Sequence, residues 1–441
     1  MQKADIVIRD GLLLTINREM DIIENGAVAI CGNKIKALGT TEEITADFQA
    51  GKTIFAKGKI IMPGLINAHT HIPMTYFRGI ADDLPLQTWL QDYIWPTESR
   101  FLNREFVYHA ALHGAAEMIK NGITLFNDMY FLGKESARAA TEAGIRGIIG
   151  EGLLDIPLAG HKNADEVIDY VKSARSEFAG SELIDFTIAP HAVYSCSSAN
   201  LIKARKLAEE FDLLLHIHVS ETEQEVLDAI QKFGKRPVHY LEDLGFLEQN
   251  VIFAHGIWVD EWEIRIMKKR SIAVAITTES HLKLASGFAP VRSYLENGVT
   301  VCLGTDGVSS NNNLDLLTEM DLTAKLHKAY NQDPTQLQAA QVVRMVTIDA
   351  ARALHKDEFL GSLEPGKLAD IILLDTNTLE AQPMYNPYSH LVYTLNSSAV
   401  STVIINGSLV MEERKLLTVD EAELIGRAGD YRQMIRENLN L

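Results

Sequence analysis

Two histidines spaced by one residue, His69 and His71, close the apolar stretch PGLINAHTH at residues 63–71. In an extended strand, alternate side chains point to the same face, so both imidazoles can face one point beyond the strand end. Imidazole is a common ligand of metal ions in proteins. A His-X-His pair also arises by chance in chains of this size, so a metal site requires further ligands elsewhere in the sequence.

Further candidate ligands occur where other apolar, β-rich runs end. His218 ends the run at residues 213–218, and Asp306 follows the run at residues 299–305. Three nitrogens and one carboxylate oxygen leave an open position for water, as a catalytic zinc or ferrous site requires. Such a metal lowers the pKa of its water towards neutrality. The sequence therefore predicts one divalent metal ion, zinc first and iron or manganese as alternatives, held by His69, His71, His218 and Asp306.

Other polar side chains near these ligands suit roles beside the metal. Glu221 follows His218 by three residues and is the candidate proton shuttle, although an acid here also suits the first turn of a helix. His255 is interpreted as a hydrogen-bond partner of the metal-bound water, because no strand ends in a lysine that would bridge two metals. His216 is an alternative ligand that we interpret as a deeper barrel residue. Most other histidines have ordinary surface or core roles, with His281 the least certain.

The elements that must position these residues alternate between strand-like and helix-like patterns. The apolar runs cover residues 60–71, 123–129, 145–150, 186–191, 213–218, 251–255, 272–277 and 299–305. Amphipathic stretches such as residues 104–120 and 200–211 separate them, which indicates βα units. Eight such units predict an α/β fold, a closed (β/α)8 TIM-like barrel, whose active site lies at the C-terminal strand ends. Six of the eight runs end in a residue that could take part in catalysis or metal binding. Besides the residues named above, these are Asp128 and His191.

Shorter β segments flank the barrel. Residues 1–55 contain short strand-like runs separated by turn signals such as Asp10-Gly11, and residues 361–441 return to strand character before a charged, helical tail from Asp420. We predict that these two segments form one small composite β-sandwich domain beside a catalytic barrel at residues 56–360. A last barrel helix is expected at residues 335–354, and later strands are expected at residues 391–394 and 402–405.

Composition limits the class of protein. The chain of 441 residues is 46% hydrophobic and 23% charged, as is typical of a soluble globular protein. It contains no apolar run of ~18–20 residues and no signal-peptide pattern at its start, so we expect a cytoplasmic protein. Cys31, Cys196 and Cys302 are too few and too far apart for a disulfide framework. The net charge of −18 disfavours nucleic acid and anionic membranes as partners.

Several motifs together resemble a known family. They are PGLINAHTH, HIHVSETEQEV, the His255-Gly256 pair, LGTDGVSSNNNLD and GSLEPGKLADIILLD, which occur between about residues 5 and 410. In order and spacing they are similar to the amidohydrolase superfamily and its cyclic deaminase branch, which includes guanine deaminase, cytosine deaminase and triazine hydrolases. Residues 77–98, 220–240 and 281–291 look most like the 5-methylthioadenosine/S-adenosylhomocysteine deaminases.

The resemblance implies hydrolytic removal of the 6-amino group of an adenine nucleoside, giving the inosine analogue and ammonia. The nucleoside would be 5′-methylthioadenosine, S-adenosylhomocysteine or a related adenosine, and the protein is expected to form a homo-oligomer. The implied catalytic residues are Glu221, which protonates the ring, Asp306, which takes a proton from water, and His255, which polarises that water. The implied substrate contacts are Glu98, on the ribose hydroxyls, His191 and Glu221.

Two positions depart from the pattern of this subtype. The third strand ends in Gly150-Glu151, where an arginine is usual, and His281 replaces the asparagine of a Pro-x-Ser-Asn pattern on the seventh strand. These departures leave the particular nucleoside open. One alternative is a hydrolase of guanine, a pterin, a triazine or another amino-heterocycle on the same scaffold. A catalytically dead scaffold protein is a further alternative, although such proteins usually lose ligands that this chain retains.

Overall fold

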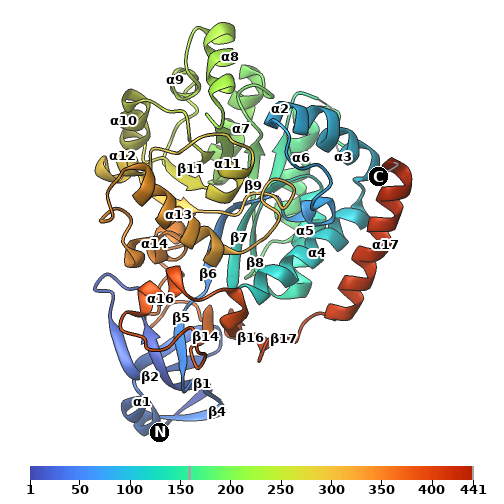
Figure 1. Cartoon of the computed structure of the whole chain (residues 1–441). Coiled ribbons are helices and arrows are strands. Elements are labelled where there is room, and N and C mark those ends of the chain that lie inside the picture. The colour runs from blue at the N-terminus through green and yellow to red at the C-terminus, as the bar shows by residue number, and fades with distance from the viewer. Residues whose placement is uncertain (157–159, 440–441) are drawn as a thin grey trace.

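Eight parallel strands form the sheet at the centre of the molecule, and helices surround it (Figure 1). The computed structural model describes residues 1–156 and 160–439. The strands are β6 (Leu65–Thr70), β7 (Ile123–Tyr130), β8 (Arg146–Leu153), β9 (Ile184–Pro190), β10 (Leu215–Val219), β11 (Val251–His255), β12 (Ala273–Ile276) and β13 (Thr300–Leu303). A parallel bridge between Thr70 and Asp306 brings the two outer strands together. The predicted α/β TIM-like barrel is therefore confirmed.

The surrounding helices follow the strands in the order that the βα pattern predicts. The helices are α4 (Arg104–Lys120), α5 (Gly133–Ala143), α6 (Ala164–Glu177), α7 (Ser198–Phe211), α8 (Glu223–Phe233), α9 (Pro237–Asp243), α10 (Glu261–Lys269), α11 (Thr278–Lys283), α12 (Val291–Glu296) and α13 (Leu316–Tyr330). Many begin at a polar cap. Asp260, for example, forms a reciprocal capping box with Glu263 at the start of α10, which satisfies backbone donors that the helix itself leaves free.

The first and last parts of the chain share a second, mixed sheet at the lower end of Figure 1. Its strands are β1 (Gln2–Leu14), β2 (Ile22–Cys31), β3 (Lys34–Thr40), β4 (Phe48–Phe55), β5 (Lys59–Pro63), β14 (Ile371–Asp375), β15 (Val400–Ile405), β16 (Ser408–Glu412) and β17 (Lys415–Leu416). They are joined in one hydrogen-bonded sheet in which β5 lies between β1 and β14. A short helix, α1 (Thr41–Asp47), lies between β3 and β4.

The first apolar run was wrongly predicted to be one strand. Residues 60–63 belong to β5, which pairs with β14 in the mixed sheet, whereas the barrel begins at Leu65. The chain passes from the mixed sheet to the barrel at Gly64. Only glycine fits there, because a Cβ atom would lie 2.2 Å from the side chain of Thr124. The mixed sheet therefore extends past residue 55, where we had placed its boundary.

Three other expected elements also differ. Residues 391–394 fall at the end of a helix, α16 (Pro387–Tyr393), because Asn386 caps its start. The last barrel helix is two helices, α14 (Ala339–Met345) and α15 (Ile348–Ala353), separated at Thr347. The Asp10-Gly11 turn signal is an irregularity within β1, where Asp10 has a φ of 69° and the pairing register with β2 shifts. The tail is helical, as predicted, and forms α17 (Glu421–Leu439) along the outside of the barrel.

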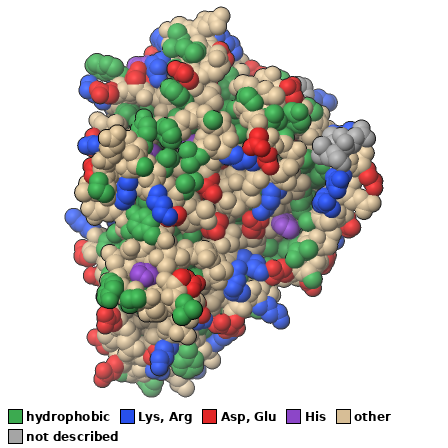
Figure 2. Space-filling view, in the orientation of Figure 1, with side chains coloured by type: hydrophobic (Ala, Val, Ile, Leu, Met, Phe, Trp, Pro, Cys, Tyr) green, Lys and Arg blue, Asp and Glu red, His purple; other side chains and the backbone are tan. Residues whose placement is uncertain are grey.

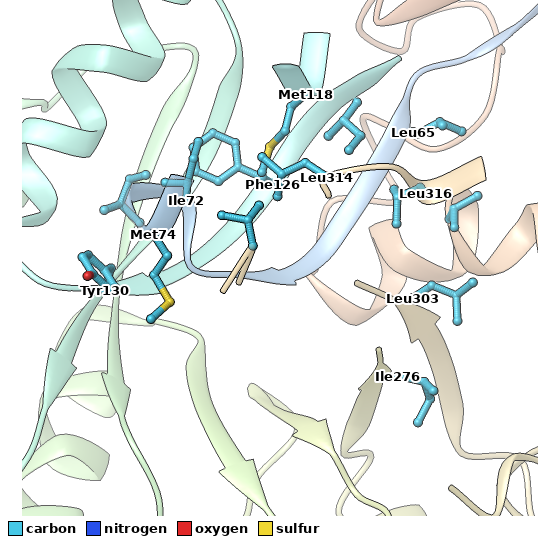
Figure 3. Close-up of a cluster of buried hydrophobic side chains, with 14 of the residues drawn as sticks. Leu65, Ile72, Met74, Met118, Phe126, Tyr130, Ile276, Leu303, Leu314 and Leu316 are labelled. Carbon is cyan, nitrogen blue, oxygen red and sulfur yellow. The ribbon is translucent and has the colours of Figure 1, made fainter. Parts of the chain in front are cut away.

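A hydrophobic cluster joins the barrel wall to the segment that follows the metal-ligand pair (Figure 3). Leu65 and Phe126 come from neighbouring strands, and Ile72 and Met74 come from the short helix η1 (Ile72–Phe77) that begins directly after His71. Figure 3 places Met74 beside Tyr130 at one end of this cluster. Hydrophobic packing of η1 against the barrel wall therefore fixes the C-terminal end of β6, which carries the histidine pair.

A buried ion pair ties the barrel to the mixed sheet. Arg146 at the start of β8 donates from Nε and Nη2 to the Asp370 carboxylate, at 2.8 and 3.0 Å, and also donates to Asn406. We expect Arg146→Met to lower the free energy of unfolding by about 3–5 kcal/mol, because it leaves a buried carboxylate without its cation. Denaturant unfolding measures the change. Arg146→Met combined with Asp370→Leu should regain much of the loss, and a double variant as unstable as the single one would contradict this explanation.

The described part of the chain has no helix long and apolar enough to cross a bilayer. All three cysteines are free. Acidic and basic side chains are interspersed over the face shown in Figure 2, so this face carries no continuous basic surface.

Candidate active site

Four predicted metal ligands meet at the C-terminal ends of three barrel strands. Nε2 of His69 and Nε2 of His71 each lie 3.3 Å from Oδ1 of Asp306, and Nε2 of His218 lies 3.3 Å from Nε2 of His71. His69 lies in β6 and His71 directly follows it, His218 lies on β10, and Asp306 follows β13. Two groups of donors share His69: one contains His71 and Asp306, and the other contains His218 and His255, and each could hold a divalent metal ion.

The Nδ1 atom of each of the three candidate ligand histidines faces away from the point where these donors meet and contacts a hydrogen-bonding group of the protein. His71 Nδ1 lies on the carbonyl oxygen of Met129, and His218 Nδ1 lies 2.8 Å from the carbonyl oxygen of His191. His69 Nδ1 lies 2.9 Å from Nε2 of His216. Because a carbonyl oxygen only accepts, Nδ1–H donates in His71 and in His218, and their Nε2 atoms present lone pairs to the shared point.

The donor set fits a cation. Nε2 of His69 is fully buried and has no hydrogen-bond partner among the described residues, and a buried polar atom left in that state is costly. A bound metal ion would satisfy it. His255 also brings a ring nitrogen within 4.8 Å of those of His69 and His218, so it lies close enough to contact the same ion or its water.

Asp306 is held in its ionised form. Burial opposes ionisation, but the adjacent imidazoles of His69 and His71 hold the pKa of its carboxyl well below the usual range. Its second oxygen, Oδ2, accepts hydrogen bonds from Ser280 Oγ at 2.6 Å and from Ser310 Oγ at 2.9 Å. Asp306 therefore has a fixed orientation with Oδ1 facing the histidines.

The pKa of the Glu221 carboxyl is shifted in the opposite direction. It is 6% exposed, and burial, with Asp306 nearby, raises the pKa of its carboxyl well above the ordinary value. Its position at the end of β10 depends on Glu225 in α8, which accepts hydrogen bonds from the backbone N–H groups of Ser220 and Glu221 at 2.9 and 2.7 Å. Thr222, rather than Glu221, caps α8, so the helix-start alternative for Glu221 does not apply.

His255 ends β11 beside Glu221, with 3.7 Å between its Nε2 and the carboxylate oxygen Oε2. Its other nitrogen, Nδ1, lies 3.2 Å from Thr277 Oγ1 and 3.1 Å from His281 Nε2. His281 is 3% exposed and belongs to this network, although the sequence left its role open. The sequence signal for His281 was that it stands where the family pattern has an asparagine.

Glu98 and His191 lie in the wall of the same cavity, which has a volume of about 690 Å³. Glu98 is on α3 (Trp95–Phe101) and accepts a hydrogen bond from the Tyr130 hydroxyl at 2.6 Å. Burial raises the pKa of the Glu98 carboxyl to about 7. Burial also lowers the pKa of His191 to about 3, so this imidazole is neutral. Sequence patterns gave no reason to single out Tyr130.

Some candidates lie outside the cavity. Asp128, predicted among the strand-end candidates, does not line the cavity, and its carboxylate accepts a hydrogen bond from the backbone N–H of Ile72 at 2.8 Å. Glu151 accepts hydrogen bonds from Leu132 N and Gly133 N, at 3.0 and 2.7 Å, at the start of α5. His216 lies behind His69, as expected for a deeper barrel residue. Side chains alternate along a strand, so a strand-end position alone does not place a residue in the site.

A barrel with imidazole and carboxylate donors at its C-terminal strand ends defines a metal-dependent hydrolase of the amidohydrolase class. The chain belongs to this class: the model of the Amidohydrolase family matches residues 60–410. It is 42% identical to the 5-methylthioadenosine/S-adenosylhomocysteine deaminase of Thermodesulfovibrio yellowstonii, over 98% of this chain and 99% of that protein. It is 41% identical to the 5′-deoxyadenosine deaminase of Methanosphaera stadtmanae, over 96% and 97%. A zinc-bound adenosine deaminase from Xanthomonas campestris superposes with a TM-score of 0.97 at 36% identity, covering 99% of both chains.

Proposed function

We propose that the protein is a metal-dependent hydrolytic deaminase that removes the 6-amino group of an adenine nucleoside. The observation that carries this proposal is the meeting of two buried carboxyl groups, Glu221 and Asp306, with a cluster of imidazole nitrogens in one cavity. Burial raises the pKa of Glu221, whereas the imidazoles lower that of Asp306. Similar chains named as deaminases of adenine nucleosides support it. The sequence motifs of the chain, which resemble those of the cyclic deaminases, also support deamination of an adenine nucleoside.

The metal site is proposed to consist of His69, His71, His218 and Asp306. A donor set of nitrogen and oxygen without thiolate suits zinc, and also iron or manganese. We propose zinc, which the similar Xanthomonas structure contains. A bound divalent ion would activate water at neutral pH by lowering its pKa.

The protein's own groups would then move the protons. Glu221 carries a proton that it can donate to the ring nitrogen next to C6, so the ring accepts the electron pair as water attacks C6. The ionised Asp306 can accept a proton from that water, and His255 is placed to hydrogen-bond to it. Asp306 then passes its proton to the amino group, the C6–N bond breaks and ammonia leaves. The new hydroxyl on C6 returns a proton to Glu221 as it becomes a carbonyl, while the ring nitrogen keeps the proton it received.

Glu98 and His191 are proposed to hold the ribose. The Glu98 carboxylate can accept hydrogen bonds from two sugar hydroxyls, and Tyr130 fixes its orientation. We expect Glu98→Ala to lower kcat/KM for nucleosides by at least ~10²-fold, because charge-assisted bonds are lost, while turnover of a free base changes little. Steady-state ammonia release measures both. Equal losses on nucleoside and base would remove Glu98 from the sugar site.

The test of the function is ammonia release by the metal-loaded protein against a panel of substrates. The panel contains methylthioadenosine, adenosylhomocysteine, adenosine, 5′-deoxyadenosine, guanine, cytosine and a pterin. Turnover of the adenine nucleosides supports the proposal. Turnover of only a free base or a pterin would keep the metal chemistry and reject the nucleoside assignment. No turnover, and no stoichiometric metal after zinc, iron or manganese is added, would favour an inactive scaffold.

We also propose that the protein works in the cytoplasm. The three free cysteines support this location, since Cys196 and Cys302 are buried as thiols and no disulfide forms.

A further inference from the structure

Helix α11 contacts two of the groups that surround the proposed metal site. Ser280 Oγ donates a hydrogen bond to Oδ2 of Asp306 at 2.6 Å. Nε2 of the next residue, His281, lies 3.1 Å from Nδ1 of His255. Ser280 and His281 are both buried, so solvent does not compete for either contact. A displacement of α11 would therefore change the surroundings of Asp306 and of His255 together.

The helix is too short to hold its own position. It has six residues, and Thr277, the residue before it, makes no side-chain hydrogen bond to the first turn. The first N–H groups of any helix have no partner within the helix, and a helix of this length is not stable on its own. Contacts with neighbouring elements must therefore fix the first turn of α11.

Glu319 of α13 supplies such a contact. Its side chain is fully buried, and its two carboxylate oxygens accept hydrogen bonds from the backbone N–H groups of Thr278 and Glu279, the second at 3.2 Å. One turn further along α13, the hydroxyl of Thr323 lies 2.6 Å from that of Thr278. A buried carboxylate is costly unless it is hydrogen-bonded. Glu319 and the first turn of α11 therefore hold each other in place.

We infer that Glu319 is a positioning residue for the reaction. By holding the first turn of α11, it fixes Ser280 against Asp306. It fixes His281 against His255 in the same way. The inference goes beyond the proposed function and rests on it for the roles of Asp306 and His255.

Glu263 of α10 offers a matched comparison. It is also fully buried, and its carboxylate oxygens accept hydrogen bonds from the backbone N–H groups of Val238 at 3.2 Å and Asp260 at 3.0 Å. Among the described residues that line the main cavity, none comes from α9 or α10. A lost hydrogen bond at Glu263 should therefore lower stability without moving a group of the site.

The first experiment compares Glu319→Gln with Glu263→Gln in the metal-loaded full chain. A carboxamide has one acceptor oxygen, and its NH2 group would face a backbone N–H, so both variants should have a lower denaturation midpoint. We expect Glu319→Gln to lower kcat per bound metal by at least ~10-fold with KM within ~3-fold, because a small misplacement of the site slows the chemical step. The Glu263→Gln variant should keep its parental kcat. Equal changes of kcat in the two variants would show that Glu319 only stabilises the fold, and would overturn the inference.

A crystal structure of Glu319→Gln gives a readout that does not depend on rate. We expect Ser280 Oγ to lie more than about 3.5 Å from Asp306 Oδ2, beyond hydrogen-bond distance. An α11 that keeps its place in the variant would overturn the inference, whatever the rate.

Ser280→Ala tests whether the effect of Glu319 passes through α11. In a variant that carries both changes, kcat should lie within ~3-fold of that of Glu319→Gln alone, because the contact of Ser280 with Asp306 is already broken. Losses that multiply would show that the two residues act independently, and would overturn the inference.

Thr323→Val replaces Glu319→Gln if that variant does not fold. It removes the hydroxyl contact with Thr278 and leaves the carboxylate of Glu319 in place. We expect it to lower kcat by at least ~3-fold, since α11 is then held by one contact fewer. A parental kcat in this variant would overturn the inference.

The choice of substrate keeps this inference separate from the proposed function. The comparisons use 5′-methylthioadenosine or, if the parent protein deaminates another member of the panel instead, that compound. A parent protein that deaminates only guanine, cytosine or a pterin would reject the nucleoside assignment, and the comparison of Glu319→Gln with Glu263→Gln would still decide the role of Glu319. A parent protein that deaminates no member of the panel would overturn both.

Discussion

Asp306→Ala and His218→Ala are expected to lose detectable turnover together with stoichiometric metal. Each change removes one donor from the group around Nε2 of His69, and removing Asp306 also removes the negative charge that the imidazoles face. Metal content after dialysis, measured by elemental analysis, and ammonia release are the two readouts.

The control for His218→Ala is His355→Ala. His355 is exposed at the opposite end of the barrel, where its Nε2 lies 3.0 Å from the carbonyl oxygen of Gln249. This variant should keep both metal and rate. If His218→Ala or Asp306→Ala bound metal as the parent protein does, the ligand assignment would be rejected.

Glu221→Gln is expected to keep the metal and to lower kcat by at least ~10²-fold, the usual scale for a lost proton donor. Glutamine has nearly the same shape, so the cavity and the hydrogen bonds from Ser220 and Glu221 N–H groups to Glu225 persist. What disappears is the transferable proton that burial keeps on this carboxyl. Steady-state kinetics and metal analysis on the same preparation separate the two effects.

Glu223→Gln is the matched control for this variant. Glu223 lies two residues further on, in the exposed first turn of α8, and its replacement should change neither metal content nor rate. A near-normal rate in a metal-loaded Glu221→Gln variant would show that another group protonates the ring.

The barrel and the set of strand-end histidines were predictable because both depend on periodic patterns. Parallel strands bring their C-terminal ends together, so the sequence alone groups His69, His71, His218 and Asp306 at one end of the barrel. Which face of a strand a residue occupies was harder to judge. Asp128 was predicted to be a strand-end candidate, yet its carboxylate accepts a hydrogen bond from the backbone N–H of Ile72 and does not line the cavity.

Contacts between distant parts of the chain could not be read from local patterns. Tyr130 positions Glu98 across 32 residues, and His281 reaches His255 across 26. The pairing of β5 with β14 joins Pro63 to Ile371. Nothing in the local sequence shows this distant pairing, and the apolar run before His69 was therefore predicted to be a single barrel strand. Residues 391–394 carry strand-like residue types, but the Asn386 cap and tertiary packing make them the end of a helix.

The pairing of β5 with β14 also bears on how the protein is made. Strand β5 leads through Gly64 directly into the strand that ends in His69 and His71, yet its partner lies more than 300 residues later in the chain. During synthesis, one edge of β5 therefore waits for a partner until nearly the whole barrel has left the ribosome. Pairings of such long range form late and slowly, and exposed strand edges are prone to association with other chains. Shortened chains that stop before Ile371 should accordingly aggregate, even though they contain all four proposed metal ligands.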